Sequence, residues 1–143
     1  MRLFSTFDTA ASGMTAERLR LDVIANNLAN ARTTRTAEGG PYRRQRVVFA
    51  ARERRDFLAM LSREPLPGHG VRVVGIAHDN APPRLVWDPY HPDAGEDGYV
   101  RMPNVDVVTE MVDMISASRA YEANATVIQA AKVMAQAALE IGR

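Results

Sequence analysis

The stretch Val107–Ile141, VVTEMVDMISASRAYEANATVIQAAKVMAQAALEI, decides the fold of this chain. It contains neither glycine nor proline, and its apolar residues recur every three or four positions, the spacing of a helix that packs along a seam. At about 1.5 Å per residue such a helix is roughly 50 Å long, and it has no core of its own. The sequence therefore predicts a long helix that needs a partner. Its expected seam residues are Val107, Met111, Met114, Tyr121, Ala125, Ile128, Ala135 and Leu139.

The partner is a second helix that the sequence predicts over residues 5–30. Ser5 is its expected N-cap, with Asp8 three residues later to complete an approximate capping box. Gly13 is a weak point, since glycine inside a helix costs about 1 kcal/mol relative to alanine. Matching seams predict an antiparallel coiled-coil pair of terminal helices. The expected seam of this first helix contains Phe7, Ala11, Met14, Leu21, Ile24, Ala25 and Leu28.

The residues between the helices predict strands and irregular connections. Residues 42–51, 71–77 and 84–87 are rich in β-branched and aromatic residues and are interpreted as strands. The last two follow each other closely and suggest a hairpin, and all three suggest a small antiparallel sheet, about the minimum for independent stability. Residues 52–70 are expected to form an exposed loop, and the Asp/Gly/Pro-rich residues 88–98 an irregular turn.

The fold class is therefore mainly α with a small β insertion. Asn104 or Asp106 is expected to cap the second long helix, and Asp106, Glu110 and Asp113 place negative charge near the positive end of its dipole. We expect three segments: the N-terminal helix in residues 1–35, a connector and small β-rich domain with the loop 52–70 in residues 36–103, and the C-terminal helix in residues 104–143.

Charge is distributed unevenly along the chain, although the formal net charge is only +1. Residues 1–55 carry 11 basic and 5 acidic residues, whereas residues 79–113 carry 2 basic and 8 acidic residues. Two opposite poles suit head-to-tail association or pairing inside one chain, and the sequence leaves both open. Of the basic residues, we expect Arg43, Arg44 and Arg46 to make lateral contacts between subunits.

The sequence offers no convincing catalytic or ligand-binding motif. It has no cysteine, which excludes disulfides and thiolate metal sites. The acidic turn lacks the ordered spacing of a calcium loop, and His91 with Asp93 has no further support as a metal site or an acid–base pair. No apolar run reaches the roughly 18 residues of a transmembrane helix, and the N-terminus, interrupted by Asp8, does not resemble a signal peptide. We expect no enzyme, cofactor, metal or membrane span.

A basic cluster is the strongest candidate for binding nucleic acid. Interleaved aromatic residues are sparse, and an acidic segment of similar size balances the charge, so we favour a solvated strand face or an intersubunit salt-bridge surface. A coiled-coil adaptor or nucleic-acid-binding protein remains the alternative, and it requires the cluster to be free of acidic partners. The cluster comprises Arg43, Arg44, Arg46, Arg52, Arg54 and Arg55.

Several amides interrupt the two predicted helices. Asn26, Asn27 and Asn30 are poor helix formers, and Asn124 has a similar position in the other helix. They either mark a frayed helix end or hydrogen-bond across a packed interface and fix its register. We expect these four amides and Tyr121 to lie at contacts between subunits.

Several passages resemble the axial proteins of the bacterial flagellum, the family of rod and hook subunits. Residues 11–30, ASGMTAERLRLDVIANNLAN, resemble the N-terminal signature of that family. Residues 106–123, with EMVDM from 110 and SRAYEAN from 118, resemble its C-terminal helix. Arg32 and Ala37 depart from the family pattern. Resemblance to the short proximal-rod members in particular comes from TTRT at 33–36, EGGPYRR at 38–44, DPYHPD at 88–93 and GYVRMPN at 98–104.

The resemblance implies a structural subunit without catalysis, whose terminal helices form a rod-core domain. They would pack with copies of the chain and with other rod proteins into the rod, which crosses the periplasm and transmits torque from motor to hook. The basal adaptor at the export gate is a further implied partner. So is the flagellar type III export apparatus, through which such subunits pass without a cleaved signal peptide. Another flagellar rod subunit is the alternative within the family.

The two lines of inference together predict the residues that pack the subunit. Met14, Leu21, Ile24 and Leu28 are expected to meet residues of the C-terminal helix, within the subunit or against neighbours. The full expected set is Phe7, Met14, Leu21, Ile24, Asn26, Asn27, Leu28, Asn30, Met111, Met114, Tyr121, Asn124, Ile128 and Leu139.

Overall fold

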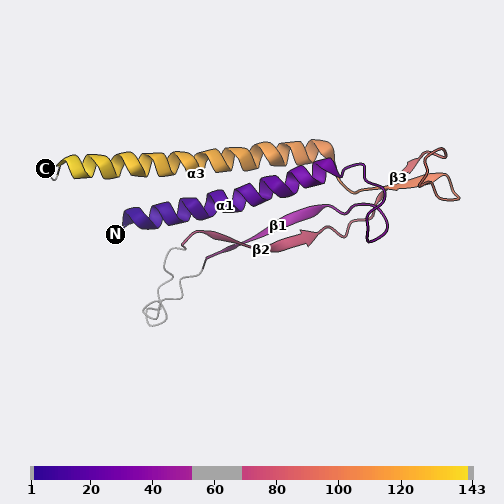
Figure 1. Ribbon diagram of the computed structural model, residues 1–143, viewed down its shortest axis with the longest axis horizontal. Coiled ribbons are helices and arrows are strands. Elements are labelled where there is room, and N and C mark those ends of the chain that lie inside the picture. Colours follow the sequence, from indigo (N-terminus) through magenta and orange to yellow (C-terminus); the bar gives the residue numbers. More distant parts are fainter. Residues whose placement is uncertain (1, 53–68, 142–143) are drawn as a thin grey trace, which may run out of the picture. The chain divides into compact units, whose positions relative to one another are not determined.

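The computed structural model describes residues 2–52 and 69–141. Along the sequence, four short strands lie between two long helices (Figure 1). In the described residues no helix has the length and apolar character needed to cross a membrane. Most of the predicted loop 52–70, together with Arg54 and Arg55 of the basic cluster, lies outside the described residues. The elements are α1 (Arg2–Ala29), β1 (Gln45–Ala51), β2 (Val71–His78), β3 (Arg84–Trp87), β4 (Tyr99–Met102) and α3 (Val107–Ile141).

Helix α3 has the bounds that the sequence predicts, and its N-cap is Asp106. Asp106 Oδ1 accepts a hydrogen bond from the backbone N–H of Val108 at 3.3 Å, and its Oδ2 accepts one from the Thr109 hydroxyl at 2.6 Å. The Thr109 hydroxyl first, and then the Val108 N–H, hold the pKa of Asp106 below its usual range. Asn104 is not the cap, because its Oδ1 instead accepts from the backbone N–H of Arg44 at 3.1 Å.

Helix α1 begins earlier than the sequence predicts, at Arg2, so the assignment of Ser5 as the N-cap is wrong. The carbonyl of Ser5 accepts a hydrogen bond from the Thr9 hydroxyl at 2.8 Å, a bond that lies inside the helix. The helix extends upstream because no glycine or proline precedes Gly13 in the chain. It ends at Ala29, close to the predicted end.

The predicted three-stranded sheet is wrong, since the strands form two separate pairs, β1–β2 and β3–β4. The predicted hairpin between residues 71–77 and 84–87 is not formed. Pro82 and Pro83 explain this, because each lacks a backbone N–H and holds the preceding residue extended, which prevents a tight turn. β3 pairs instead with β4, a segment outside the three predicted strands.

The β3–β4 hairpin has one packed face and one exposed face. Its strands are antiparallel, with Val86 opposite Val100 and Trp87 opposite Tyr99. Val100 is fully buried, whereas Leu85 and Trp87 on the other face are exposed. Side chains alternate between the faces of a strand, so this hairpin contributes one side to the core and leaves an apolar side open.

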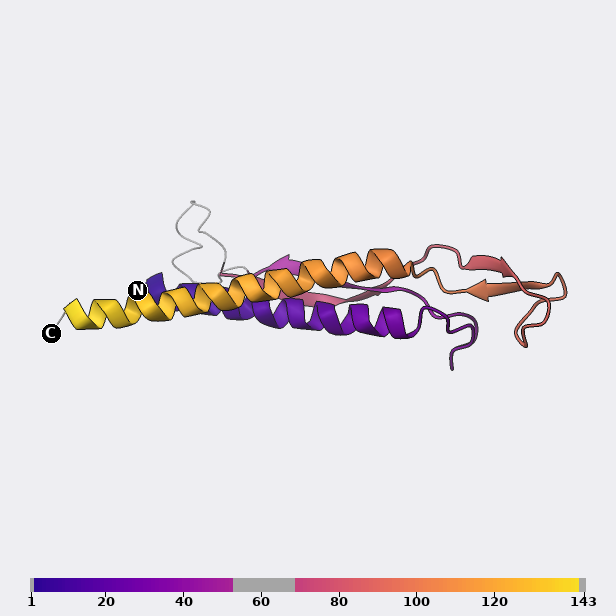
Figure 2. The same ribbon diagram turned by 90° about the horizontal axis from the view of Figure 1, so that it is seen from above.

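The chain divides into two compact units, and each contains part of both helices. One unit comprises Met1–Leu19, Val48–Gly75 and Ala117–Arg143, and the other comprises Arg20–Val47 and Ile76–Ser116. Within each unit a stretch of α1 runs beside a stretch of α3 (Figures 1 and 2). Segments far apart in the sequence are thus joined in both units.

The inward stripe of α3 differs from the predicted seam. One set of buried and half-buried positions recurs with alternating steps of four and three residues, which is the heptad spacing, and Asp113, Ser118, Ala120 and Ala125 beside it are also half-buried. Met111 and Leu139, predicted on the seam, are 54% and 75% exposed, and Val107 is also exposed. The prediction chose residues by apolar character alone, whereas the stripe includes the polar residues Glu110 and Asn124 and several small alanines. Its members are Glu110, Met114, Ala117, Tyr121, Asn124, Ile128, Ala131 and Ala135.

Candidate functional site

Asn27 of α1 is the centre of a buried polar cluster. Its side chain is 1% exposed. Its Nδ2 donates to the Gln45 carbonyl and to Glu110 Oε2, both at 2.9 Å. Its Oδ1 accepts from the Gln45 N–H and from the Tyr42 hydroxyl, again both at 2.9 Å. An amide has two donors and an oxygen with two lone pairs, so this side chain makes every hydrogen bond it can.

Glu110 of α3 brings a buried negative charge into the same cluster, and Arg44 balances it. Glu110 is 1% exposed, and its Oε1 accepts from Arg44 Nε at 2.6 Å. Arg44 Nη2 reaches Asp113 Oδ2 at 3.1 Å, and Arg20 Nη2 lies 3.5 Å from Asp113 Oδ1. A buried carboxylate is tolerated only when it is paired and hydrogen-bonded, and here both conditions are met.

Tyr42 connects the cluster to the segment that follows α1. Burial, and then the negative charge of Glu110, raise the pKa of Tyr42 above its ordinary value. The phenol is therefore held neutral, as it must be to donate to Asn27. We call these residues the polar cluster: Arg20, Asn27, Tyr42, Arg44, Gln45, Glu110 and Asp113. It fixes α1, the connector and α3 in one register, because a shift of any of them leaves buried groups unpaired.

The polar cluster changes the interpretation of two predicted contact residues. Asn27 and Arg44 were expected between subunits, but the structure places both inside the chain. The partners of Asn27 and Arg44 come from distant parts of the same chain. Asn27 is only 1% exposed, whereas Arg44 is half-buried, and its contact between subunits stays a prediction. Arg44 belongs to the basic segment, and Glu110 and Asp113 belong to the acidic one. The two poles are thus paired within the chain at this point.

The other predicted amides have different surroundings. Asn30 Nδ2 donates to the carbonyl and to the Oδ1 of Asn26, at 3.0 and 2.9 Å, and the Asn26 side chain is exposed. Asn124 Nδ2 donates to the carbonyl of Ala120 at 2.9 Å. These bonds are local to one helix. Asn26 Nδ2 also donates to the Tyr42 hydroxyl at 3.3 Å, and Asn30 Oδ1 accepts from the Thr33 hydroxyl at 3.1 Å, so both amides contact the segment after α1, but neither is as buried as Asn27.

Most of the remaining predicted packing residues are partly open. Ile24 is buried, and Arg43 and Arg46 are exposed. A half-buried side chain retains surface that a neighbouring molecule can cover. The half-buried residues of the predicted set are Phe7, Met14, Leu21, Leu28, Met114, Tyr121 and Ile128.

Gly13 is a point of close approach between α1 and α3. A Cβ built on Gly13 would lie 2.9 Å from Asn124 Nδ2, closer than real Cβ contacts. One residue earlier, the buried hydroxyl of Ser12 accepts a hydrogen bond from the backbone N–H of Val71 in β2 at 3.1 Å. In this unit α1 therefore contacts α3 on one side and β2 on another, and both contacts need small residues.

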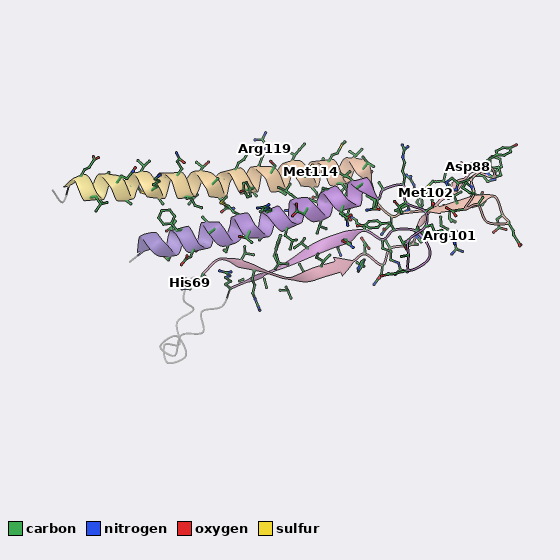
Figure 3. The ribbon with its side chains drawn as sticks, viewed as in Figure 1. His69, Asp88, Arg101, Met102, Met114 and Arg119 are labelled. Atoms are coloured by element: carbon green, nitrogen blue, oxygen red, sulfur yellow. The ribbon has the colours of Figure 1, made fainter. Side chains whose placement is uncertain are left out.

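An apolar stripe on α3 remains uncovered. Val108, Met111, Val112 and Ile115 recur at helical spacing, and each is more than half exposed. The sequence prediction named Met111 but missed the other three. Farther along the helix, Arg119 is exposed and points away from α1 (Figure 3). A contiguous exposed apolar surface of this kind marks a site of interaction with another molecule.

Two members of the polar cluster could be found from their spacing. Asn27 lies three residues after Ile24 and four after Val23, on the buried stripe of α1. Glu110 precedes Met114 and Ala117 by four and seven residues, on the buried stripe of α3. A polar residue at such a position signals a buried hydrogen bond, but its partners from the connector have no comparable signal. In the described residues no group of His, Asp and Glu side chains is arranged to hold a metal ion.

Comparisons with known proteins agree with these features. The family described as "Flagella basal body rod protein" matches residues 7–35, and "Flagellar basal body rod FlgEFG protein C-terminal" matches residues 96–141. The flagellar basal-body rod protein FlgC of Borreliella burgdorferi is 51% identical over 99% of this chain and 98% of its own length. The chain belongs to the FlgC family.

Two further relatives span the whole of both chains. The FlgC proteins of Bacillus subtilis and Salmonella typhimurium are 42% and 41% identical to it, and each alignment covers 100% of this chain and 100% of the relative. The segment with the β strands and the polar connector is therefore matched along with the terminal helices.

Proposed function

We propose that this chain is a structural subunit of the rod of the bacterial flagellar basal body, in its proximal part. The observation that carries the proposal is the full-length identity of 41–51% to proteins named flagellar basal-body rod protein FlgC. The role is mechanical and requires no catalysis. As part of the rod, the subunit transmits torque from motor to hook.

The terminal helices supply the contacts of the rod core in this proposal, and residues 36–103 lie outside that core. The heptad spacing of the α3 stripe favours coiled-coil packing of α1 with α3. The exposed stripe formed by Val108, Met111, Val112 and Ile115 faces neighbouring subunits, which cover it. Leu139 and the half-buried residues Leu21 and Ile128 belong to the same set of intersubunit contacts.

The partners in this proposal are copies of the chain, other rod proteins and the basal adaptor at the export gate. The subunit reaches the rod, which crosses the periplasm, through the flagellar type III apparatus. The alternative function, binding nucleic acid through the basic cluster, is disfavoured. Arg44 of that cluster is neutralised by Glu110 and Asp113, whereas phosphate binding needs uncompensated basic residues.

Complementation tests the proposed function. This chain is expressed in a non-swimming strain of a flagellated bacterium from which the FlgC gene has been deleted. Basal bodies are then purified from that strain. We expect restored swimming and the chain in the purified basal bodies, and we expect both to be lost in Leu21→Asp and Ile128→Asp. A chain that is stably produced but absent from basal bodies would contradict the proposal. Incorporation of either variant at the wild-type level would contradict the packing of the helices.

A further inference from the structure

Helix α1 carries a regular stripe on the side that faces away from α3. Gly13, Arg20 and Asn27 follow each other at seven-residue intervals, and each lies against a residue of α3. A second set of positions, all exposed, is displaced from these three by two residues, which turns an α-helix by about 200°. Its members recur in steps of four and three residues, the spacing of a helix that packs along a seam. We call them the α1 outer stripe: Ala11, Thr15, Arg18, Asp22, Ala25 and Ala29.

Helix α3 carries a matching outer stripe. Glu110, Ala117 and Asn124 lie on its inward side at seven-residue intervals, and the exposed set is again displaced by two residues. It begins with Val112 and Ile115, which are 62% and 58% exposed, and it becomes polar farther along the helix. Both outer stripes lie opposite the α1–α3 contact, so within one chain neither can cover the other. The α3 outer stripe comprises Val112, Ile115, Arg119, Glu122, Thr126 and Gln129.

The charged residues of the two outer stripes have no ion-pair partner within the chain. Among the residues that the structure describes, no carboxylate forms an ion pair with Arg18 or Arg119. In the same part of the chain, no basic group forms one with Asp22 or Glu122. All four side chains are exposed, and Arg119 points away from α1 (Figure 3). These charges are therefore open to a second molecule.

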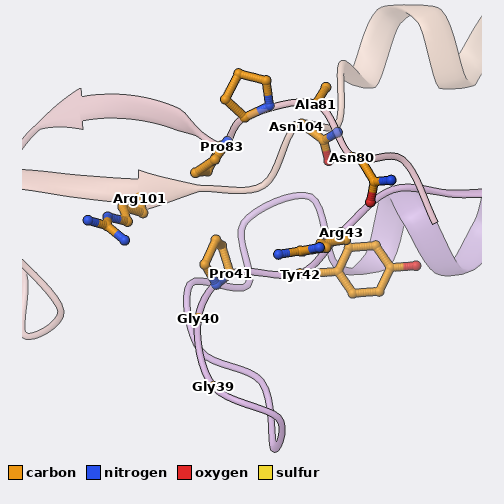
Figure 4. Close-up of a pocket in the computed structure, with 11 residues that line it drawn as sticks. Gly39, Gly40, Pro41, Tyr42, Arg43, Asn80, Ala81, Pro83, Arg101 and Asn104 are labelled. Atoms are coloured by element: carbon orange, nitrogen blue, oxygen red, sulfur yellow. The ribbon is translucent and has the colours of Figure 1, made fainter.

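Two other exposed arginines have a different setting. Arg43 and Arg101 line a hollow of about 290 Å³ at the base of the β3–β4 hairpin (Figure 4). The Thr34 hydroxyl donates to Asp93 Oδ2 at 2.7 Å, and Asp93 lines a neighbouring space together with Arg101. An acidic side chain of the same chain is thus close to this hollow. The outer stripes, in contrast, each face away from the helix that carries the complementary charges.

The order of the charges selects an antiparallel pairing of the two outer stripes. In both stripes an arginine precedes a carboxylate by about one helical turn. Parallel helices would place like charges against each other. Antiparallel helices instead place Arg18 against Glu122, and in the same register Asp22 meets Arg119. Opposite charges across a seam favour this alignment, and like charges disfavour the alternative.

The same register also matches the sizes of the apolar residues. Ala25 lies three residues after Asp22, and Ile115 lies four residues before Arg119, so Ala25 and Ile115 face each other. One step farther along both helices, Ala29 faces Val112. Each large exposed residue therefore meets a small one, an arrangement in which facing side chains interdigitate and apolar surface is buried.

We propose that the α1 outer stripe of one copy packs antiparallel on the α3 outer stripe of a second copy, with Arg18–Glu122 and Asp22–Arg119 as ion pairs. A second copy is the partner because this chain carries both halves of the match in a single register. The contact is head-to-tail, since it joins two different surfaces, and repeated contacts of this kind generate rings or helical arrays. The inference rests on the proposed function as a rod subunit, and it names the surfaces by which adjacent copies meet.

Cysteine cross-linking tests the register, because the natural chain has no cysteine that would interfere. Ala25→Cys and Ile115→Cys chains carrying different tags are produced together in the strain that lacks its own FlgC, and basal bodies are treated with an oxidant or a short bismaleimide. We expect a dimer that carries both tags. Ala11→Cys with Ile115→Cys is the matched control and should give none, because Ala11 lies on the same stripe but about 20 Å from Ala25 along the helix.

The outcomes separate this inference from the proposed function. If both variants are present in basal bodies and no mixed dimer forms, or if Ile115→Cys forms a bond with a different rod protein, the inference is wrong and the rod function stands. A dimer formed by Ala25→Cys alone or by Ile115→Cys alone would also contradict it, since like stripes would then pair. If the unmodified chain is absent from basal bodies, the proposed function itself fails.

Charge exchange keeps the inference testable if a cysteine variant is excluded from basal bodies. Arg18→Glu and Glu122→Arg should each reduce swimming, and the two changes combined in one chain should restore it, because every contact between copies then regains an opposite pair. Arg18→Glu combined with Glu140→Arg is the matched control. It changes the charges equally, but at an exposed position of α3 beyond the proposed ion pairs, and it should not restore swimming. Wild-type swimming of both single variants, or equal restoration by the two combined variants, would overturn the inference.

Discussion

At the scale of single residues, Asn27 contributes more to the stability of the fold than its small side chain suggests. Replacement by leucine, which has the same branching but two larger methyl groups, removes four hydrogen bonds and leaves the Gln45 N–H and carbonyl, Glu110 Oε2 and the Tyr42 hydroxyl without this partner. Each buried group left unpaired costs about 1–3 kcal/mol. We expect Asn27→Leu to lower the free energy of unfolding by about 3 kcal/mol or more. Urea unfolding followed by circular dichroism measures this loss.

Asn26 is the matched control, because it is the neighbouring amide, its side chain is exposed, and it makes only one bond to the polar cluster, from Nδ2 to the Tyr42 hydroxyl at 3.3 Å. Asn26→Ala should lower the free energy of unfolding by no more than about 1 kcal/mol, because the hydrogen bonds that it removes are exposed and water can replace them. Equal effects of the two changes would mean that the polar cluster does not stabilise the chain.

Tyr42 makes the stability of the chain depend on alkaline pH. Its pKa is raised above 10.0, first by burial and second by the charge of Glu110, so the folded state favours the neutral phenol more than the unfolded state does. This stabilisation is complete below pH 10.0 and is lost as the pH rises through the higher pKa of the folded chain. We expect Tyr42→Phe to decline less steeply in unfolding free energy above pH 10.0 than the wild type.

The control for this pH dependence is Tyr90→Phe. Tyr90 is 97% exposed, so the unfolding free energy of Tyr90→Phe should fall with pH as steeply as that of the wild type. A slope that is equally steep in Tyr42→Phe and in the wild type would contradict the role assigned to the Tyr42 phenol.

At the scale of elements, Gly13 sets how closely α1 approaches α3. Alanine normally favours a helix over glycine by about 1 kcal/mol. Here the added Cβ would meet Asn124 Nδ2 at 2.9 Å and Oδ1 at 3.0 Å, and Asn124 is held by its bond to the Ala120 carbonyl. We therefore expect Gly13→Ala to destabilise the wild type but to stabilise an Asn124→Ala chain by up to about 1 kcal/mol. Unfolding of all four chains measures this coupling.

A stabilising effect of Gly13→Ala that is equal in both backgrounds would show that the two helices do not touch at this point. The opposite signs expected in the two backgrounds cannot come from helix propensity, which is the same in both. They distinguish a packing role for Gly13 from a merely tolerated glycine.

The sequence predicts the helices well and the strand pairing poorly, for physical reasons. The bounds of α3 follow from local features: a stretch without glycine or proline, and the carboxylate of Asp106 at its start. The pairing of β3 with β4 depends on contacts between separate segments, and nearness in sequence wrongly favoured β2 as the partner of β3. The polar cluster was missed for the same reason, since Arg44 and Glu110 meet only after the chain has folded.

At the scale of the whole molecule, the two kinds of surface on α3 have different roles. Its inward stripe carries Glu110, whose hydrogen bonds are complete within the chain. Its uncovered stripe carries Val112 and Ile115, which are 62% and 58% exposed and are not covered by the residues that the structure describes. Polar contacts thus fix the inward side of α3 near its start, whereas the exposed stripe on the same helix is apolar. Burial of apolar surface contributes about 25 cal/mol per Å², so assembly has a driving force that folding of one chain leaves unused.

Val112→Asp separates these two roles. Val112 is 62% exposed, so a carboxylate there stays hydrated in the isolated chain, and we expect a free energy of unfolding within about 0.5 kcal/mol of the wild type. In the assembled rod the same carboxylate would be buried without a partner, at a cost of several kcal/mol. We therefore expect normal production of a folded chain, its absence from purified basal bodies, and no swimming.

Ser116→Asp adds the same charge at an exposed polar position one turn farther along α3, and it should incorporate and support swimming. Comparing the two variants removes charge as the explanation and leaves the position of the substitution. Incorporation of Val112→Asp at the level of Ser116→Asp would mean that the apolar stripe remains open in the rod. The surface that covers the subunit would then have to be sought elsewhere, first on the exposed face of the β3–β4 hairpin with Leu85 and Trp87.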